Sequence, residues 1–121
     1  MKVAYRIWID HKGKVFGDGP HEILKRIEKT GSLRQVATQM GMSYSKAWKR
    51  IREIEQRLDF PLLDRKVGGQ SGGGSRITPR AKELMLCYAR FQREAKVAIE
   101  RVYRKQFASF AKLPGRKEGL K

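Results

Sequence analysis

Basic and hydroxyl side chains are concentrated between residues 43 and 52, at spacings that place them on one side of a helix. At about 100° per residue, the polar positions of the segment 44–58 lie opposite an apolar stripe. No acidic residue precedes Glu53 in this segment, so its N-terminal half is positive. A solvated helix face normally mixes charges of both signs in i,i+4 pairs, whereas clustered Lys and Arg side chains suit phosphates and base edges. The pattern predicts a surface that contacts nucleic acid.

A glycine-rich stretch, GGQSGGGS, supplies a second predicted contact region and has basic residues on both sides. It lacks the Gly-Lys-Ser/Thr ending of a nucleotide-binding loop. We interpret it as the tip of a wing, because glycines allow close approach to a sugar-phosphate backbone or the minor groove. A hairpin loop without contacts is the alternative. The residues predicted to contact DNA are Ser43, Tyr44, Ser45, Lys46, Lys49, Arg50, Arg52, Arg65, Lys66 and Arg76.

Two short helices joined by a turn that contains glycine must position the basic face. Ser32, followed by Gln35, forms a capping box that starts a helix over 33–40, and Ser43 caps the helix over 44–58. Gly41 lies between them, where the turn needs a positive φ angle. The residues predicted to be buried are Leu33, Val36, Ala37, Met40, Ala47, Trp48, Ile51, Ile54 and Leu58. This arrangement is typical of a helix-turn-helix unit, whose second helix enters the major groove of DNA.

The segments around this unit complete a mostly α-helical domain with a small amount of β structure. Alternating apolar residues from Val3 to Ile9, a turn, and a short return strand predict an N-terminal β-hairpin over 3–16. Pro20 suits the first position of a helix that Gly31 ends. Strands over 62–67 and 76–78 flank the wing tip. We therefore predict a winged helix-turn-helix DNA-binding domain over 1–78, with the hairpin at 3–16, the helix-turn-helix at 33–58 and the wing at 62–78.

A long C-terminal helix follows, with Thr78 as its cap and Pro79 at its first position. Its apolar residues form a narrow seam with the spacing 4-3-4-3-4, which is typical of coiled coils: Leu84, Tyr88, Phe91, Ala95, Ala98 and Val102. A helix of about 30 residues extends about 45 Å, which is longer than a small core can cover. We predict a dimerisation helix over 79–110 and a disordered basic tail over 111–121. Packing of the whole seam on its own domain is the alternative.

Composition narrows the classes of protein that fit. The chain has 121 residues, with 28 Lys and Arg against 12 Asp and Glu, which gives a formal net charge of +16. Such basic domains usually bind a polyanion. No apolar run is long enough for a membrane span, and the single cysteine excludes an intramolecular disulfide, so we expect a cytoplasmic protein without a membrane partner. We expect Cys87 to pack as a small apolar side chain, with redox sensing as the alternative.

Catalytic chemistry is not predicted. His11 and His21 lie in or beside predicted turns, without the spacing of a metal site or an acid–base pair. We therefore expect no enzyme activity, no metal and no cofactor.

Two stretches carry a resemblance to a known family. TGSLRQVATQMGMSYSKAWKRIREIEQRLDFPLLDR, followed by GGQSGGGSRITPRAKEL, resembles the N-terminal DNA-binding domain of ModE-type molybdate-responsive regulators and, more distantly, the winged helix of LysR-type regulators. The opening VAYRIWIDHKGKVFGDGP is similar to the ModE-type N-terminal hairpin, which LysR-type proteins generally lack. The resemblance covers about residues 3–105. Ala81 stands where the family usually has glycine, and we expect the chain to lack the molybdate-binding domains into which sensor-bearing members continue.

This resemblance implies a transcription factor with a winged helix-turn-helix and a dimerising C-terminal helix. It places Ser43, Tyr44, Ser45, Lys46 and Lys49 on the recognition helix, and 67–76 on the wing. The sequence as a whole predicts a homodimeric regulator that binds double-stranded DNA with sequence specificity. The alternatives are a nonspecific architectural nucleic-acid-binding protein and a DNA-binding subunit that docks a separate sensor protein.

Overall fold

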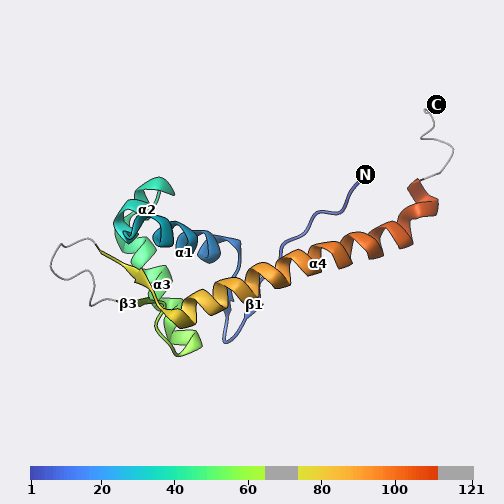
Figure 1. Cartoon of the computed structure of the whole chain (residues 1–121). Helices are drawn as coiled ribbons and strands as arrows, with labels where there is room; N and C mark the ends of the chain where they lie inside the picture. Colours follow the sequence, from blue (N-terminus) through green and yellow to red (C-terminus); the bar gives the residue numbers. More distant parts are fainter. Residues whose placement is uncertain (65–73, 112–121) are drawn as a thin grey trace. The chain divides into compact units, whose positions relative to one another are not determined.

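The structure, a computed structural model, describes residues 1–64 and 74–111. In chain order these residues form β1 (Ile9–Asp10), β2 (Lys14–Phe16), α1 (Asp18–Thr30), α2 (Leu33–Gln39), α3 (Tyr44–Leu58), β3 (Leu63–Asp64), β4 (Arg76–Ile77) and α4 (Pro79–Ala111) (Figure 1). The strands pair as two antiparallel hairpins, β1 with β2 and β3 with β4. The predicted fold class, a mostly α-helical winged helix-turn-helix with a long C-terminal helix, is confirmed. The described residues fall into two units, one of residues 7–88 and one of residues 1–6 with 89–111.

Side-chain caps set the starts of α2 and α3 where the sequence predicts them. The Ser32 hydroxyl accepts the N–H of Gln35 at 3.0 Å, and the Ser43 hydroxyl accepts the N–H of Lys46 at 3.1 Å. The Ser32 N–H is donated to the Thr30 hydroxyl at 3.2 Å, so Thr30 takes the role that the capping box assigned to Gln35. Gly31 and Gly41 both have positive φ angles, 72° and 68°, which glycine adopts without strain. The predicted corners on either side of α2 are therefore confirmed.

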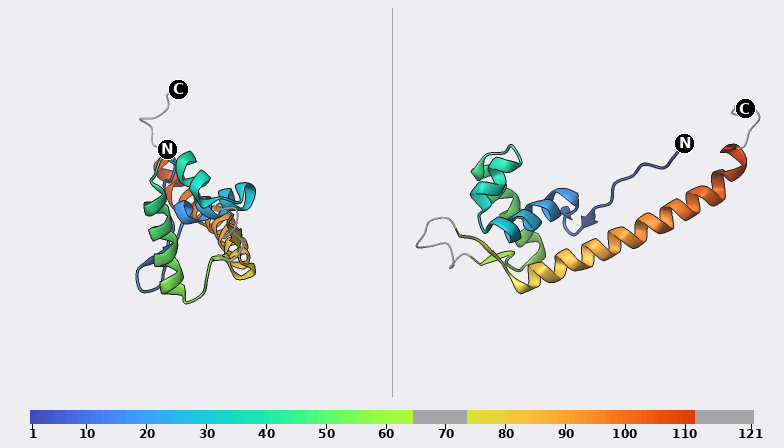
Figure 2. Two further views of the ribbon diagram at one scale, coloured as in Figure 1. Left: turned by 90° about the vertical axis from the view of Figure 1, so that its left-hand side faces the viewer. Right: turned by 45° about the horizontal axis from the view of Figure 1, so that its top comes forward.

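The core of the unit 7–88 is formed by apolar side chains from every helix and from β2, β3 and β4. The small residues Ala37 and Ala47 are 1 % and 0 % exposed, and α2 contacts α3 closely. Both views in Figure 2 show α1, α2 and α3 grouped together, and β4 packs against α1. Met40, Trp48 and Leu58, all predicted to be buried, are only partly buried at the edge of this core.

The first hairpin is shorter than predicted. Only Ile9–Asp10 pairs with Lys14–Phe16, so the alternating residues 3–8 are not a strand. The return strand has three residues, which leaves 3–8 without a partner for backbone pairing. Helix α1 begins at Asp18, two residues before the predicted Pro20. Proline is tolerated there because the first-turn N–H groups have no helical partner in any case.

The first turns of α4 belong to the core, and the side chain of Tyr88 is buried in it. Its ring is 2 % exposed and lies 5.2 Å from the rings of Phe16 and His21. Its hydroxyl bonds to Asp18 Oδ1 at 3.0 Å, and burial together with this bond raises the pKa of Tyr88 to about 12. The sequence analysis predicted that Tyr88 lies in a seam that faces a second chain. This prediction is wrong, because the Tyr88 side chain is buried in the core of its own unit. Cys87, expected to pack inside, is instead exposed.

The second unit combines residues 1–6 with 89–111 of α4. Val3 and the α4 side chains Ala98, Ile99, Val102 and Phe107 line an apolar groove of about 420 Å³. The rings of Tyr103 and Phe107 stack at 5.1 Å. About half of the surface of each of the side chains Phe91, Val97, Val102, Phe107 and Phe110 is exposed. This part of α4 is therefore apolar well beyond what residues 1–6 cover.

Candidate nucleic-acid interface

The exposed face of α3 carries the predicted basic cluster. Tyr44, Ser45, Lys46, Lys49 and Arg52 are exposed, and Arg50 is partly buried at the flank. The opposite face is held by Ala47, Ile51 and Ile54, which are at most 2 % exposed. Because this burial fixes the rotation of α3, Lys46 and Lys49 project away from the core of their own unit. The structure thus brings together the predicted contact residues 43–50 on one accessible surface.

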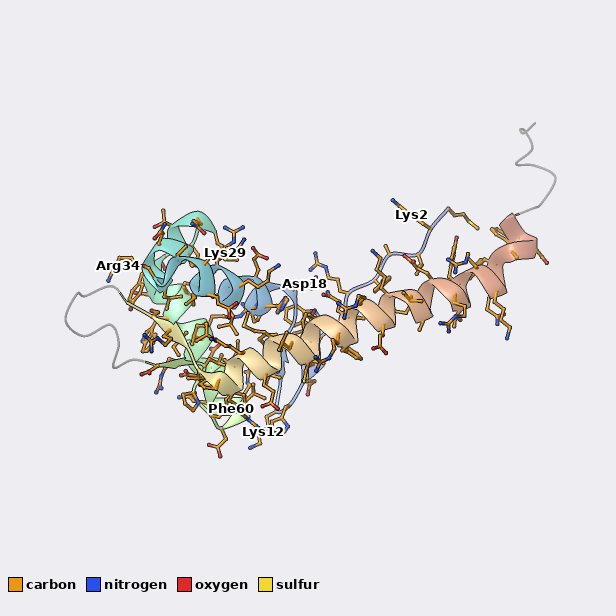
Figure 3. The ribbon with its side chains drawn as sticks, viewed as in Figure 1. Lys2, Lys12, Asp18, Lys29, Arg34 and Phe60 are labelled. Atoms are coloured by element: carbon orange, nitrogen blue, oxygen red, sulfur yellow. The ribbon has the colours of Figure 1, made fainter. Side chains whose placement is uncertain are left out.

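An arginine of α2, which the sequence analysis did not select, extends this surface. The Arg34 guanidinium lies 4.2 Å from the centre of the Tyr44 ring, and both side chains are exposed. Arg34 projects from α2 in Figure 3. Stacking on the ring face leaves the guanidinium edge free to donate hydrogen bonds. The helical period of α2 marks Arg34 as exposed, but its contact across the turn with Tyr44 depends on the fold.

Arg52 has a second role besides the one predicted for it. Its Nη1 lies 3.7 Å from Oε1 of Glu55, a carboxylate that is only 6 % exposed. Glu55 Oε2 accepts the backbone N–H of Leu62 at 2.7 Å and that of Leu63 at 3.4 Å. Glu55 therefore ties α3 to the start of the wing, and Arg52 balances its charge. The sequence analysis missed Glu55, although its position four residues after Ile51 lies inside the buried stripe.

The described part of the wing is anchored at both strands. Leu63 pairs with Ile77 and Asp64 with Arg76, whose side chain is exposed. The Thr78 N–H is donated to Leu62 O at 3.0 Å, and the Ser75 N–H to Gly31 O at 2.7 Å. The Thr78 hydroxyl also caps α4 by accepting the Ala81 N–H at 3.1 Å, as predicted. Arg65, Lys66 and residues 68–73 of the glycine tip lie outside the described residues.

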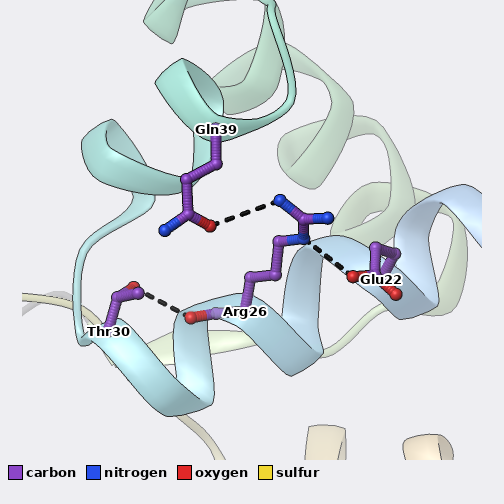
Figure 4. A network of polar contacts seen from close by, with 4 residues as sticks. All are labelled: Glu22, Arg26, Thr30 and Gln39. Atoms are coloured by element: carbon purple, nitrogen blue, oxygen red, sulfur yellow. Dashed lines mark hydrogen bonds and ion pairs between the residues drawn. The ribbon is translucent and has the colours of Figure 1, made fainter.

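A polar network sets α2 against α1 and so fixes the base of the helix-turn-helix (Figure 4). Arg26 Nε bonds to Glu22 Oε2 at 2.7 Å, while Arg26 Nη1 reaches Gln39 Oε1 at 3.4 Å. The Thr30 hydroxyl donates to the Arg26 carbonyl at 2.8 Å. The ion pair lowers the pKa of Glu22. Exposed pairs of this kind contribute little stability, so their main effect here is to orient the side chains between the helices.

The side chains that metal binding would need are dispersed among the described residues. Within 1–64 and 74–111, no three His, Cys, Asp or Glu side chains form a group that could hold a metal ion. His21 lies within α1 rather than in a turn, beside Phe16 and Tyr88. Burial, and then repulsion by Lys25, lower the pKa of His21. Among the helices of the described residues, none has the length and apolarity of a membrane span.

The sequence of this chain is similar to a known protein family and to several known proteins. The model of the family "Bacterial regulatory helix-turn-helix protein, lysR family" matches residues 21–82, which include most of α1, the elements from α2 to β4 and the first residues of α4. The chain is 38 % identical over 90 residues to the "DNA-binding transcriptional dual regulator ModE" of Escherichia coli. It is 29 % identical over 111 residues to the "Molybdenum-pterin-binding protein MopB" of Rhodobacter capsulatus, and 35 % identical over 71 residues to the "Transcriptional regulator ModE" of Haemophilus influenzae.

These alignments cover 73 %, 92 % and 59 % of this chain, respectively. The same alignments span only 34 %, 38 % and 28 % of the relatives' own lengths. A solved structure, "Crystal structure of ArgP from Mycobacterium tuberculosis", aligns with 72 % of the chain and 31 % of its own length, at a TM-score of 0.49 and 23 % identity.

Proposed function

Because the chain belongs to the lysR family of bacterial regulatory helix-turn-helix proteins, we propose that it regulates transcription by binding double-stranded DNA with sequence specificity. The observation that carries this proposal is the exposed, acid-free N-terminal half of α3, with Lys46 and Lys49 directed away from the core. Recognition helices reach base edges with their N-terminal residues. No catalytic role is proposed, since the family description is regulatory.

In this proposal α3 enters the major groove, while Arg76 and the basic residues before the wing tip contact the backbone or minor groove. Residues 1–78 form the DNA-binding domain. Arg34 adds a contact at the α2–α3 corner, because its guanidinium lies over the Tyr44 ring with its edge free to donate hydrogen bonds. Arg52 acts mainly through its charge, since it also balances the carboxylate of Glu55. Such a regulator works where the chromosome lies, in the bacterial cytoplasm.

We further propose that two chains pair through α4 over 79–110. Helix α4 has 33 residues, or about 50 Å of length. Its apolar side chains Phe91, Val102 and Phe107 are about half exposed, which is costly in water and favours a second apolar surface. Ala95, Ala98 and Leu84, partly buried, complete the pairing face, and Tyr88 is excluded from it. A two-fold dimer would place two recognition helices about 34 Å apart, one turn of DNA.

The decisive experiment selects duplexes from a random pool and measures their binding by fluorescence anisotropy across a salt series. Lys46→Ala and Lys49→Ala are compared with Lys29→Ala, an exposed lysine of α1 (Figure 3). Loss of a base contact should weaken binding to the selected duplex by about 5- to 100-fold, with less effect on a scrambled one. Loss of a phosphate contact should weaken both equally and reduce the salt slope by about 0.9.

Equal affinity of the unaltered protein for selected and scrambled duplexes would contradict sequence specificity and favour the architectural alternative. Light scattering tests the pairing separately. A dimer should have twice the monomer mass of 14.0 kDa. A stable monomer would contradict pairing through α4 and favour a subunit that docks a separate sensor protein.

A further inference from the structure

A pocket of about 300 Å³ lies between the first hairpin and the C-terminal half of α3. It is within the unit 7–88 and borders the exposed face of α3 described above, with which it shares Arg50. Its lining includes Trp8, Lys14, Pro20, Arg50, Glu53 and Arg57. Three cationic side chains and one carboxylate give the lining a formal charge of +2, from +3 and −1.

Arg57 is held in place by the hairpin turn. Its Nη1 donates to the Lys14 carbonyl at 2.8 Å, which leaves further guanidinium N–H groups for other acceptors. Gly13, with φ 121°, lies directly beside this guanidinium: a Cβ at that position would lie 3.1 Å from Arg57 Cζ, which is a tight contact. The turn is therefore shaped to receive the guanidinium.

The aromatic wall is fixed in a similar way. A Cβ on Gly17 would lie 2.5 Å from Cε3 of Trp8, so the indole rests directly against this glycine. The Lys14 ammonium lies 4.6 Å from the centre of the Trp8 ring. Arg50 forms no hydrogen bond or ion pair with another residue of the described chain. Two cations are thus oriented before any ligand arrives, and a third is available.

We propose that this pocket binds an oxyanion, either a phosphate or a carboxylate group, through Lys14, Arg50 and Arg57. Oriented cations around a concave site bind such groups by charge-assisted hydrogen bonds, and a prearranged site loses less entropy on binding. The volume fits a small ligand. The oxyanion has two possible sources, a free small anion or a backbone phosphate of DNA. Binding of a free small anion would go beyond the proposed function. Binding of a DNA phosphate rests on the proposed function.

The first arm of the test needs no DNA. Sodium phosphate is titrated into the full chain against sodium chloride of equal ionic strength, and the indole N–H of Trp8 and the amides of 13–17 and 50–57 are followed by NMR. Saturable shifts confined to these residues are expected. Lys14→Gln and Arg57→Gln should each weaken the apparent affinity about tenfold or more, while Lys29→Gln, with the same loss of charge, should leave it within twofold. Lys14→Gln keeps the backbone carbonyl that holds Arg57, so this variant preserves the hairpin contact.

The second arm measures DNA affinity across a salt series for the same variants. If the oxyanion is a DNA phosphate, Lys14→Gln should reduce the salt slope by about 0.9 relative to Lys29→Gln, and free phosphate should compete with DNA. If the oxyanion is a free anion, the two variants should have equal slopes. The proposal is overturned if phosphate causes no saturable shift and the slopes are also equal. DNA binding through Lys46 and Lys49 would be unaffected by that result, so the two proposals fail independently.

Discussion

Replacing Glu55 with alanine removes the acceptor that joins the recognition helix to the wing. Two backbone N–H groups, those of Leu62 and Leu63, then lose their partner in a site where the Glu55 side chain is 6 % exposed. A buried donor without an acceptor costs about 1–3 kcal/mol. The bond to Leu62 is short at 2.7 Å and dominates, while the bond to Leu63 is long at 3.4 Å and adds little.

We therefore expect Glu55→Ala to lower the free energy of unfolding by about 1–3 kcal/mol, a substantial part of the about 5–15 kcal/mol typical of a domain. Glu55→Gln keeps an oxygen for the Leu62 N–H and loses only the charge, so a loss of about 1 kcal/mol is expected. Urea unfolding followed by circular dichroism, with linear extrapolation, measures both values. Glu28→Ala, at an exposed position of α1, is the matched control and should stay within about 0.5 kcal/mol of the unaltered protein.

Two results would refute this reasoning. A value for Glu55→Ala indistinguishable from the control would mean that the buried N–H groups find another acceptor at no cost. Equal losses for Glu55→Ala and Glu55→Gln would mean that the charge, and not the acceptor, is what stabilises the junction. In either case Glu55 would not be the link between α3 and β3.

Other predictions concern the corner of the helix-turn-helix and the contacts of Tyr88. Gly41→Ala should destabilise by about 1–2 kcal/mol, because φ is 68° and the added Cβ meets no atom within 4 Å, so backbone strain acts alone. Gly41→Asn should lose less stability than Gly41→Ala in the same urea assay. Equal losses for the two variants would point to a cause other than the positive φ angle. The raised pKa of Tyr88, about 12 against 10.0, gives stability that is complete below pH 10 and is lost as pH rises toward 12. Between pH 9 and 11.5 Tyr88→Phe should therefore lose less stability than the unaltered protein, and parallel losses would contradict the raised pKa. The pKa of His21 is lowered below 6.5, so its contribution is complete above that pH and declines as pH falls through the lower, folded-state pKa. Between pH 7 and pH 5 the free energy of unfolding of His21→Gln should fall less than that of the unaltered protein. An equal fall in the two proteins would exclude His21 as the source of this pH dependence.

The sequence was most informative where local physical chemistry decides the structure. Ser32, Ser43 and Thr78 cap helices through bonds to residues three positions away, and Gly31 and Gly41 have backbone angles that few other residues adopt. These signals depend on near neighbours and predicted α2, α3 and the start of α4 to within a residue. The exposed basic face could be predicted as well, because the apolar stripe fixes the rotation of α3.

The features that sequence reasoning missed depend on contacts between distant residues. Tyr88 has the spacing of a coiled-coil seam, yet its hydroxyl partner is Asp18, 70 residues away. Arg52, predicted to contact DNA, also lies beside the carboxylate of Glu55, and the burial of that carboxylate depends on the fold. The alternation of residues 3–8 is a strand pattern, but a strand also needs a partner, and β2 is too short to supply one. Periodicity identifies a face of an element, and the fold decides what that face contacts.

The two backbone bonds that secure the wing strands have a practical consequence. Thr78 N–H to Leu62 O and Ser75 N–H to Gly31 O hold described residues on either side of 65–73 in the unit 7–88. Doubling the length of a loop between fixed ends costs only about 0.6 kcal/mol. Peptide libraries of varied length can therefore be grafted between Asp64 and Gly74 while the scaffold is retained. Selection from such libraries offers a way to engineer new operator preferences without altering a single side chain of α3.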